Sequence, residues 1–243
     1  TKIVESGTYT APQDQDLTFG ALEVAASPVT FDFSANPLRK VVLSDRFAVT
    51  MRKGKVDFIG GEWNGNGTGV FNCGYGRDYP YVDVVLSSCV WTNLPNVIVG
   101  RNAAVCSLTL DNNSRIYSKE FRLVNAGRGY CSLNILGGSG LFLSHTTDTP
   151  FRTDSRNSDG GNGTITVAGD GSILSAPYSE FRFGYHAADQ FLVVSNNASL
   201  VANNLYIGKN ATAERARVLV ADNASVTAAN IYMSSIDGNM IVS

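Results

Sequence analysis

The chain lacks long apolar runs and has little charge. Its 243 residues contain no apolar stretch long enough to cross a membrane, and no signal peptide precedes the rest. Charged residues make up 16% of the chain and the formal net charge is −2. This near-neutral balance gives no reason to expect nucleic acid as a partner. Because the sequence starts abruptly at Thr1 and stops at Ser243 soon after a repeat, we expect a processed or truncated form that has lost any targeting signal.

Recognisable catalytic motifs are also missing. There is no G-x-S-x-G elbow, no phosphate loop and no dinucleotide fingerprint, and His145 and His186 have no recognisable Ser or Cys partner. None of the spacings is typical of a zinc site, since no C-x-x-C occurs. These absences argue against nucleophilic catalysis and structural zinc.

The cysteines are few: Cys73, Cys89, Cys106 and Cys131. Cys106 and Cys131 begin the matching motifs CSLTL and CSLNI and share the parity of the apolar residues around them. This pattern predicts a stack of buried thiols, because free cysteine behaves as a small buried hydrophobe. A disulfide remains the alternative.

One unit is written twice near the end of the chain. LVVSNNASLVANNLYI, residues 192–207, is followed 26 residues later by VLVADNASVTAANIYM, residues 218–233. Within each copy, short runs of alternating apolar residues are separated by Asn, Ser and Asp, which indicates strands joined by tight turns. Such self-similarity is the signature of a repeat architecture. We therefore expect Asn197 to lie above Asn223 and Asn204 above Asn230, about 4.8 Å apart.

The same phase extends backwards through most of the chain. A pair of apolar residues, two apart, recurs at steps of 25 to 27 residues with one step of 32. The pairs are Phe31/Phe33, Val56/Phe58, Val82/Val84, Leu108/Leu110, Leu133/Ile135, Ile165/Val167, Leu192/Val194 and Val218/Val220. The sequence thus predicts a single all-β solenoid of about eight to nine rungs over residues 1–243. Residues 1–28 would form a cap and an incomplete first turn, and residues 29–243 the regular rungs.

Two segments interrupt the regular rungs. The glycine- and aromatic-rich segment 60–80 is expected to leave the coil in its latter part, and a long loop is expected over residues 144–162. Both fall at the end of a turn and are predicted to flank a shared surface.

The repeats resemble a known class. NNASLVANNLYIG followed by DNASVTAANIYMS is similar to the repeats of bacterial surface and autotransporter-type passenger proteins. The whole-chain spacing is similar to the right-handed parallel β-helix of the pectate-lyase-like group, and this resemblance implies the right-handed coil. A leucine-rich repeat is the rival, since residues 105–113 fit its strand consensus, but most repeats lack its preceding leucine.

Three aspartates are candidate metal ligands. Asp32, Asp57 and Asp83 each lie between the two core positions of a rung, so they are expected to point outward and to stack. Stacked carboxylates repel one another, and calcium, which prefers hard oxygen ligands, would relieve this. The alternative is a solvated strand face whose charge Lys53 and Lys55 offset.

The calcium interpretation carries an enzymatic hypothesis. Polysaccharide lyases of the resembled fold class hold calcium on carboxylates of neighbouring turns, which implies Lys55 and Arg77 as candidate bases here. The sequence contains no NTD, GHG or RIK set of the polygalacturonase type, and its acids fall in the early rungs. Catalysis is thus the less favoured interpretation.

Two further sets are candidate ligand contacts. Arginines recur near one corner as Arg52, Arg77, Arg101, Arg128, Arg152 and Arg182, and a basic stripe of this kind suits an anionic glycan or lipid headgroup. Aromatic residues gather between Phe58 and Trp91, with Trp63, Tyr75, Tyr79 and Tyr81 as candidate sugar-stacking rings. The alternatives are corner ion pairs and core filling.

A last outward set is apolar: Ile59, Val85, Leu136, Phe191, Val193 and Leu219. Such a patch suits self-association, although scattered exposed apolar residues are common. Taken together, the sequence predicts a secreted or cell-surface structural and adhesive module that contacts a polysaccharide or cell-surface glycan. The alternative is a calcium-assisted lyase acting on an acidic polysaccharide.

Overall fold

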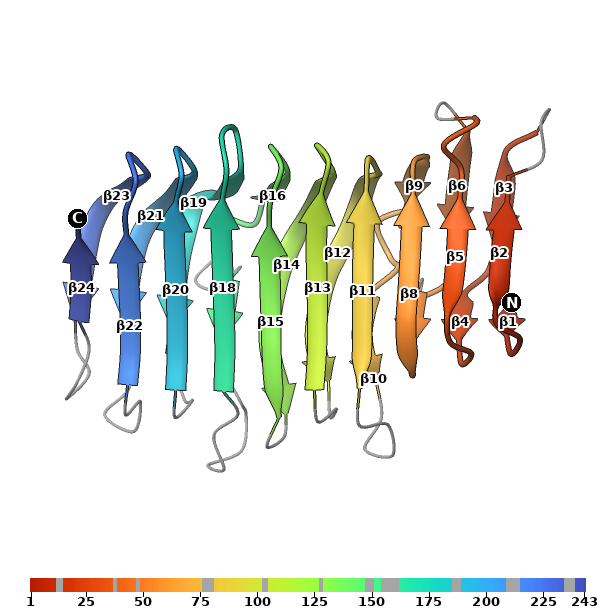
Figure 1. Cartoon of the computed structure of the whole chain (residues 1–243), viewed down its shortest axis with the longest axis horizontal. Coiled ribbons are helices and arrows are strands. Elements are labelled where there is room, and N and C mark those ends of the chain that lie inside the picture. Colours follow the sequence, from red (N-terminus) through yellow and green to blue (C-terminus); the bar gives the residue numbers. More distant parts are fainter. Residues whose placement is uncertain are drawn as a thin grey trace.

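The protein is described by a computed structural model over residues 1–11, 15–36, 39–46, 49–75, 81–101, 105–126, 129–146, 151–153, 162–184, 189–208, 215–233 and 239–243. Every regular element in these ranges is a β-strand (Figure 1). None of these residues belongs to a helix long and apolar enough to cross a membrane.

One parallel sheet runs the length of the molecule and faces the viewer in Figure 1; we call it the front sheet. Its ten strands follow one another in chain order. They are β2 (Gly7–Thr10), β5 (Val29–Asp32), β8 (Gly54–Ile59), β11 (Val82–Ser87), β13 (Val105–Asp111), β15 (Tyr130–Ile135), β18 (Asn162–Ala168), β20 (Asp189–Ser195), β22 (Arg215–Val220) and β24 (Asn239–Val242). Strands that pair in chain order with one return between them form a solenoid.

The return strands form a second parallel sheet behind the first, which we call the rear sheet. The early turns each place two short strands in it: β3 (Leu17–Phe19) with β4 (Leu22–Val24), β6 (Lys40–Leu43) with β7 (Val49–Met51), and β9 (Glu62–Asn64) with β10 (Phe71–Tyr75). Later turns use β12 (Val90–Arg101), β14 (Arg115–Ala126), β16 (Gly140–Leu143), β17 (Phe151–Thr153), β19 (Ile173–Phe183), β21 (Ser199–Ile207) and β23 (Ser225–Met233), while β1 (Lys2–Ile3) pairs with β4. The all-β parallel solenoid expected from the sequence is confirmed, with a number of turns close to the expected one.

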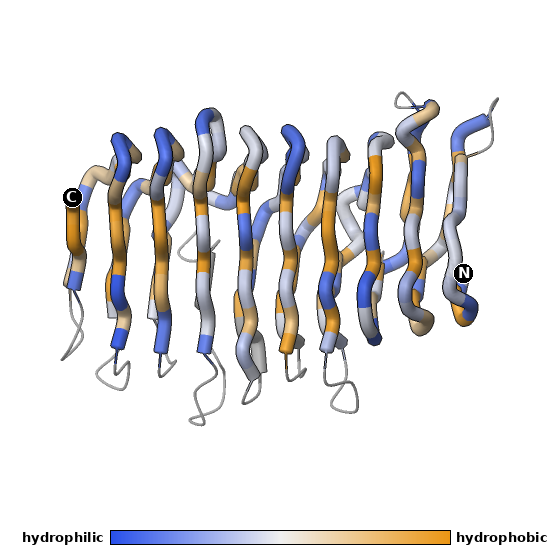
Figure 2. The backbone as a smooth tube through the Cα atoms, viewed as in Figure 1, coloured by the Kyte–Doolittle hydropathy of each residue, from blue (hydrophilic) through white to orange (hydrophobic). Residues whose placement is uncertain are grey.

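Local chemistry explains why the chain turns where it does. Along the front strands apolar and polar residues alternate, so one side of each strand packs into the core (Figure 2). The corners after these strands use left-handed backbone angles, which glycine and asparagine tolerate best. Gly137 and Gly138 form one such corner and Asn196 and Asn197 another, with φ between 55° and 75°.

The core between the sheets is a set of stacked apolar ladders. Aromatic rings concentrate in its first half, where Trp63 stacks between Phe33 and Trp91 with ring centroids 5.1 and 4.9 Å away. Aliphatic residues fill the second half, as in the column Leu133, Ile165, Leu192 and Val218. The sheets are held together mainly by this burial, since each buried aliphatic side chain contributes about 1.5–3 kcal/mol.

The predicted register is correct in the later rungs and wrong in the earlier ones. From Leu108 onward the pairing follows the predicted ladder. In the first rungs, however, Phe31 pairs with Phe58, and Val56 pairs with Val84. The predicted pairing is thus shifted by two residues there. A shift of two leaves every side chain on the same face, so alternation alone does not distinguish the two registers.

The predicted thiol stack is confirmed. All four cysteines are free and buried, and Cys106 pairs with Cys131 in neighbouring strands. Burial raises the pKa of the Cys89 thiol to about 12. This thiol lies 3.1 Å from the carbonyl oxygen of Phe58 and serves as a corner donor.

The interrupting segments contribute more strand than expected. The first 28 residues already pair with the next turn, through β1, β2 and β3. The segment 60–80 supplies β9 and β10, and the expected loop 144–162 contains β17, which pairs with both β14 and β19. Residues 76–80, 147–150 and 154–161 lie outside the described ranges.

Candidate functional site

A short motif places charged residues on the outer face of the rear sheet. E-F-R occurs as Glu120–Arg122 in β14 and again as Glu180–Arg182 in β19. Phe121 and Phe181 are fully buried, so alternation directs the flanking Glu and Arg outward. The short strand β17 lies between β14 and β19, and its Arg152 backbone pairs with both arginine positions.

The same two columns continue in both directions. Asn96 pairs with Glu120 at one end, while Glu180 is followed by Asn204 and Asn230 at the other. In the second column Arg182 is followed by two tyrosines. We call this surface the rear ladder: Asn96, Glu120, Arg122, Glu180, Arg182, Asn204, Tyr206, Asn230 and Tyr232.

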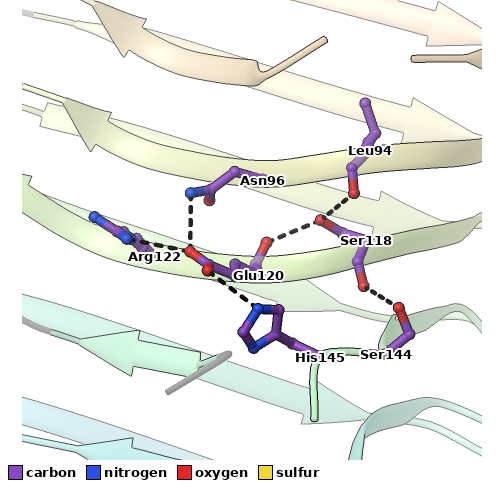
Figure 3. Close-up of polar contacts among 7 residues, drawn as sticks. All are labelled: Leu94, Asn96, Ser118, Glu120, Arg122, Ser144 and His145. Carbon is purple, nitrogen blue, oxygen red and sulfur yellow. Dashed lines mark hydrogen bonds and ion pairs between the residues drawn. The ribbon is translucent and has the colours of Figure 1, made fainter. Parts of the chain in front are cut away.

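Glu120 is the centre of the best-connected part of the rear ladder (Figure 3). Its carboxylate accepts hydrogen bonds from the Asn96 amide at 3.3 Å and from the Arg122 guanidinium at 3.1 Å. The ring of His145 lies 3.8 Å from the other carboxylate oxygen. All three partners converge from different segments, so the carboxylate is fixed in place while about a quarter of it remains exposed.

Glu180 repeats this arrangement two strands away. The Arg182 Nε donates to its carboxylate at 2.6 Å. Burial raises the pKa of the neighbouring Tyr206 hydroxyl, and the negative charge and hydrogen bond of Glu180 add to this. Next in line, the Tyr206 and Tyr232 rings stack at 4.6 Å, and the Asn230 amide donates to Asn204 at 2.9 Å. The Asn204–Asn230 stacking expected from the repeat is therefore confirmed.

The rear ladder offers hydrogen-bond donors, acceptors and ring faces in two straight lines along the solenoid axis. Neighbouring strands lie about 4.8 Å apart, so the two carboxylates are separated by about 10 Å. Each carboxylate already accepts from an arginine, which makes it an acceptor and not a proton donor. The arrangement therefore suits binding of hydroxyl-bearing groups better than acid–base chemistry.

The three predicted metal ligands do not form one ladder. Asp57 pairs with Thr30 and Val85, whereas Asp83 pairs with Lys55 and Ser107. Asp32 pairs with Ile59 and accepts hydrogen bonds from Ser34, which lower its pKa. The expected stack of carboxylates is thus wrong, because the true register differs by two residues. Within the described ranges no group of three or more His, Cys, Asp or Glu is arranged to hold a metal ion.

The remaining predicted site residues are scattered. The Lys55 ammonium pairs with Asp57 at 3.3 Å. Trp63 is fully buried in the core, so its predicted role as a sugar-stacking ring is wrong. Tyr75 lies beneath the Arg52 guanidinium, 5.3 Å from its ring centroid, and Tyr81 is about half exposed beside Asp83. Arg77 and Tyr79, and the side chain of Arg101, lie outside the described residues.

The arginines align differently from the predicted stripe. Arg52 pairs with Glu23, with 3.1 Å between Nε and the carboxylate. Arg152 aligns with Arg122 and Arg182, and Arg122 was absent from the predicted series. The signal for this column is the dipeptide Phe-Arg, which occurs at residues 121–122, 151–152 and 181–182. Its spacing is even, but it was hidden among unevenly spaced arginines.

Comparisons add no relative. The chain matches no protein-family model, no curated protein and no solved structure. Its likeness to surface and passenger proteins therefore rests on the repeat pattern alone.

Proposed function

We propose that this solenoid is a non-catalytic structural and adhesive module that contacts an extended glycan through the rear ladder. The observation that carries the proposal is the recurrence of the Glu-Arg pair, at 120/122 and 180/182, in line with stacked tyrosines. A glycan chain presents hydroxyls and apolar ring faces at repeated intervals. Carboxylates and guanidinium groups bind the former, and tyrosine rings bind the latter.

The preorganisation of these side chains favours binding. Glu120 is held by Asn96 and Arg122, and Glu180 by Arg182, so little side-chain entropy remains to be lost on binding. The ladder is also built on strands, which position side chains more exactly than loops do.

Binding is preferred over cleavage for two reasons. Glycoside hydrolysis needs one protonated carboxyl, and both carboxylates of the rear ladder are ion-paired acceptors. A calcium-assisted lyase needs shared carboxylates, and Asp32, Asp57 and Asp83 lie in separate columns. An extracellular or cell-surface location is part of the proposal and is supported by the resemblance of the repeats to surface proteins.

The test is retention on immobilised xylan, galactomannan and polygalacturonate, followed by affinity measurement with whichever polymer is retained. We expect Glu120→Gln with Glu180→Gln to weaken binding about tenfold, because two charge-assisted hydrogen bonds become neutral. Glu62→Gln is the matched control, since its carboxylate pairs with Lys40 at 3.8 Å elsewhere on the rear sheet. Equal loss in the control, or no retention on any polymer, would contradict the proposal. Circular dichroism confirms that each variant is folded.

A further inference from the structure

A second surface feature lies on the opposite side of the molecule from the rear ladder. The outer face of the front sheet contains a depression of ≈ 260 Å³ over β15, β18, β20 and β22, which are neighbours in Figure 1. Its lining includes Tyr130, Thr164, Asp189, Phe191, Arg215 and Arg217. This site does not depend on the rear ladder or on its proposed role.

Residue size explains why the surface is lowered here. β18 begins Asn162-Gly163-Thr164, with small side chains, and it lies between Tyr130 of β15 and Phe191 of β20. The register pairs Tyr130 with Asn162, and Thr164 with Phe191. A strand of small residues between two aromatic residues leaves a hollow with a ring on either side.

The two rings are exposed yet held. Tyr130 is 48% exposed and Phe191 is 40% exposed. The Tyr130 hydroxyl lies 2.8 Å from the Thr164 hydroxyl, which ties the ring to β18. Exposed aromatic rings beside hydroxyl and amide groups combine an apolar face with polar edges, which is the combination that sugar rings require.

The depression carries one uncompensated positive charge. Asp189 and Arg215 pair with each other through two contacts, at 2.7 and 2.9 Å, and so neutralise one another. Arg217 follows Phe191 in the neighbouring strand, and no residue of the described ranges forms an ion pair with it. The site thus offers a guanidinium fork, suited to a carboxylate, directly beside an aromatic face.

We propose that this depression binds a hexuronate residue of an acidic glycan, with its ring on Tyr130 and Phe191 and its carboxylate on Arg217. A hexuronate joins the three features that the site accommodates: a flat apolar ring face, several hydroxyls and one negative charge. A simple anion would use the arginine and leave both rings unoccupied. A neutral sugar would leave the arginine unpaired.

The proposal is tested by calorimetric titration of the whole chain with trigalacturonate and, in parallel, with neutral galactotriose and inorganic phosphate. We expect trigalacturonate to bind at least about tenfold more tightly than the neutral trisaccharide. Arg217→Gln should abolish that preference, and Phe191→Ala should weaken both sugars. Lys53→Gln, which removes an exposed positive charge elsewhere, is the matched control and should have no effect.

Several outcomes would overturn the inference. Equal affinity for the charged and neutral trisaccharides would remove the role of Arg217, and phosphate competing as well as the uronate would reduce the site to an anion site. An equal loss in Lys53→Gln would show general charge attraction. Binding lost in Glu120→Gln with Glu180→Gln, but retained in Arg217→Gln and Phe191→Ala, would move the uronate to the rear ladder and leave only the proposed function standing.

Discussion

The corner residues show how single positions define each turn of the coil. Asn113, Gly138, Gly171, Asn197 and Asn223 occupy equivalent places after successive front strands, and all have φ between 59° and 75°. Only glycine and asparagine adopt this left-handed conformation at low cost. The repeated asparagines, which first indicated the repeat, are therefore explained by backbone geometry at the corners and by amide stacking at Asn204 and Asn230.

Replacing Asn197 with valine should destabilise the chain by about 1–2 kcal/mol, because a β-branched residue is disfavoured in the left-handed region. Asn197→Gly is the control and should cost much less, since glycine occupies the equivalent corner at Gly138. Urea denaturation measures both. Equal losses in the two variants would assign the effect to the lost side-chain amide and not to the backbone.

At the scale of an element, the corner is completed by a buried hydroxyl or thiol. Ser114 Oγ accepts from the Cys89 N–H at 3.1 Å and lies 2.9 Å from the Leu86 carbonyl oxygen. Ser139 accepts from the Ser114 N–H in the same way. This ladder gives partners to backbone groups that the change of strand direction would otherwise leave buried and unpaired. Cys89 stands at the start of the ladder, where serine would serve equally well.

Cys89→Ser should keep its stability near neutral pH and lose less of it in alkali. The folded pKa of Cys89 is about 12, above the ordinary value of 9.0. Between these values the unfolded chain loses the thiol proton and the folded chain keeps it, so rising pH favours unfolding. The thiol's contribution is fully present below pH 9 and decreases by about 2 kcal/mol by about pH 10.5.

Urea midpoints at about pH 8 and pH 10.5 test this difference, with the other buried thiols and the tyrosines common to both proteins. Parallel losses in the parent chain and in Cys89→Ser would show that Cys89 ionises at an ordinary pH. A large loss for the variant at pH 8 would show that serine is not an equivalent corner donor.

At the scale of the whole molecule, each turn contacts mainly its neighbours. The pairs of elements with the most contacts, such as β12 with β14 and β19 with β21, are all adjacent in their sheet. Stability in such a solenoid is close to a sum of local terms and nearest-neighbour interfaces. The aromatic first half and the aliphatic second half are therefore expected to respond separately to mutation.

Trp91→Leu should destabilise the first half without affecting the last turns. Trp91 is fully buried and contacts Trp63, Phe58 and Phe71, so its replacement leaves a cavity and should cost about 2–4 kcal/mol locally. Hydrogen-exchange mass spectrometry should show faster exchange in β9, β10 and β12 and unchanged exchange in β20 and β22. A uniform increase along the chain would mean that the solenoid unfolds as one cooperative unit.

The sequence by itself determined the architecture. Alternation with a period of two, turn residues at steps of about 26 and a repeated unit together allow few structures besides a parallel solenoid. It also determined that the cysteines are buried and that Asn204 stacks on Asn230, because the last two repeats are so alike that their register is unambiguous.

Only the tertiary structure decided which outward residues share a surface. A shift of two residues keeps each side chain on its face, so alternation did not fix the register of the early rungs, and the aspartates were wrongly aligned. The rear ladder joins Glu120 and Glu180 across two turns, and the depression joins Tyr130 to Phe191. Such neighbours are set by turn lengths summed over whole rungs, and an uneven turn changes that sum without leaving a mark in the local pattern.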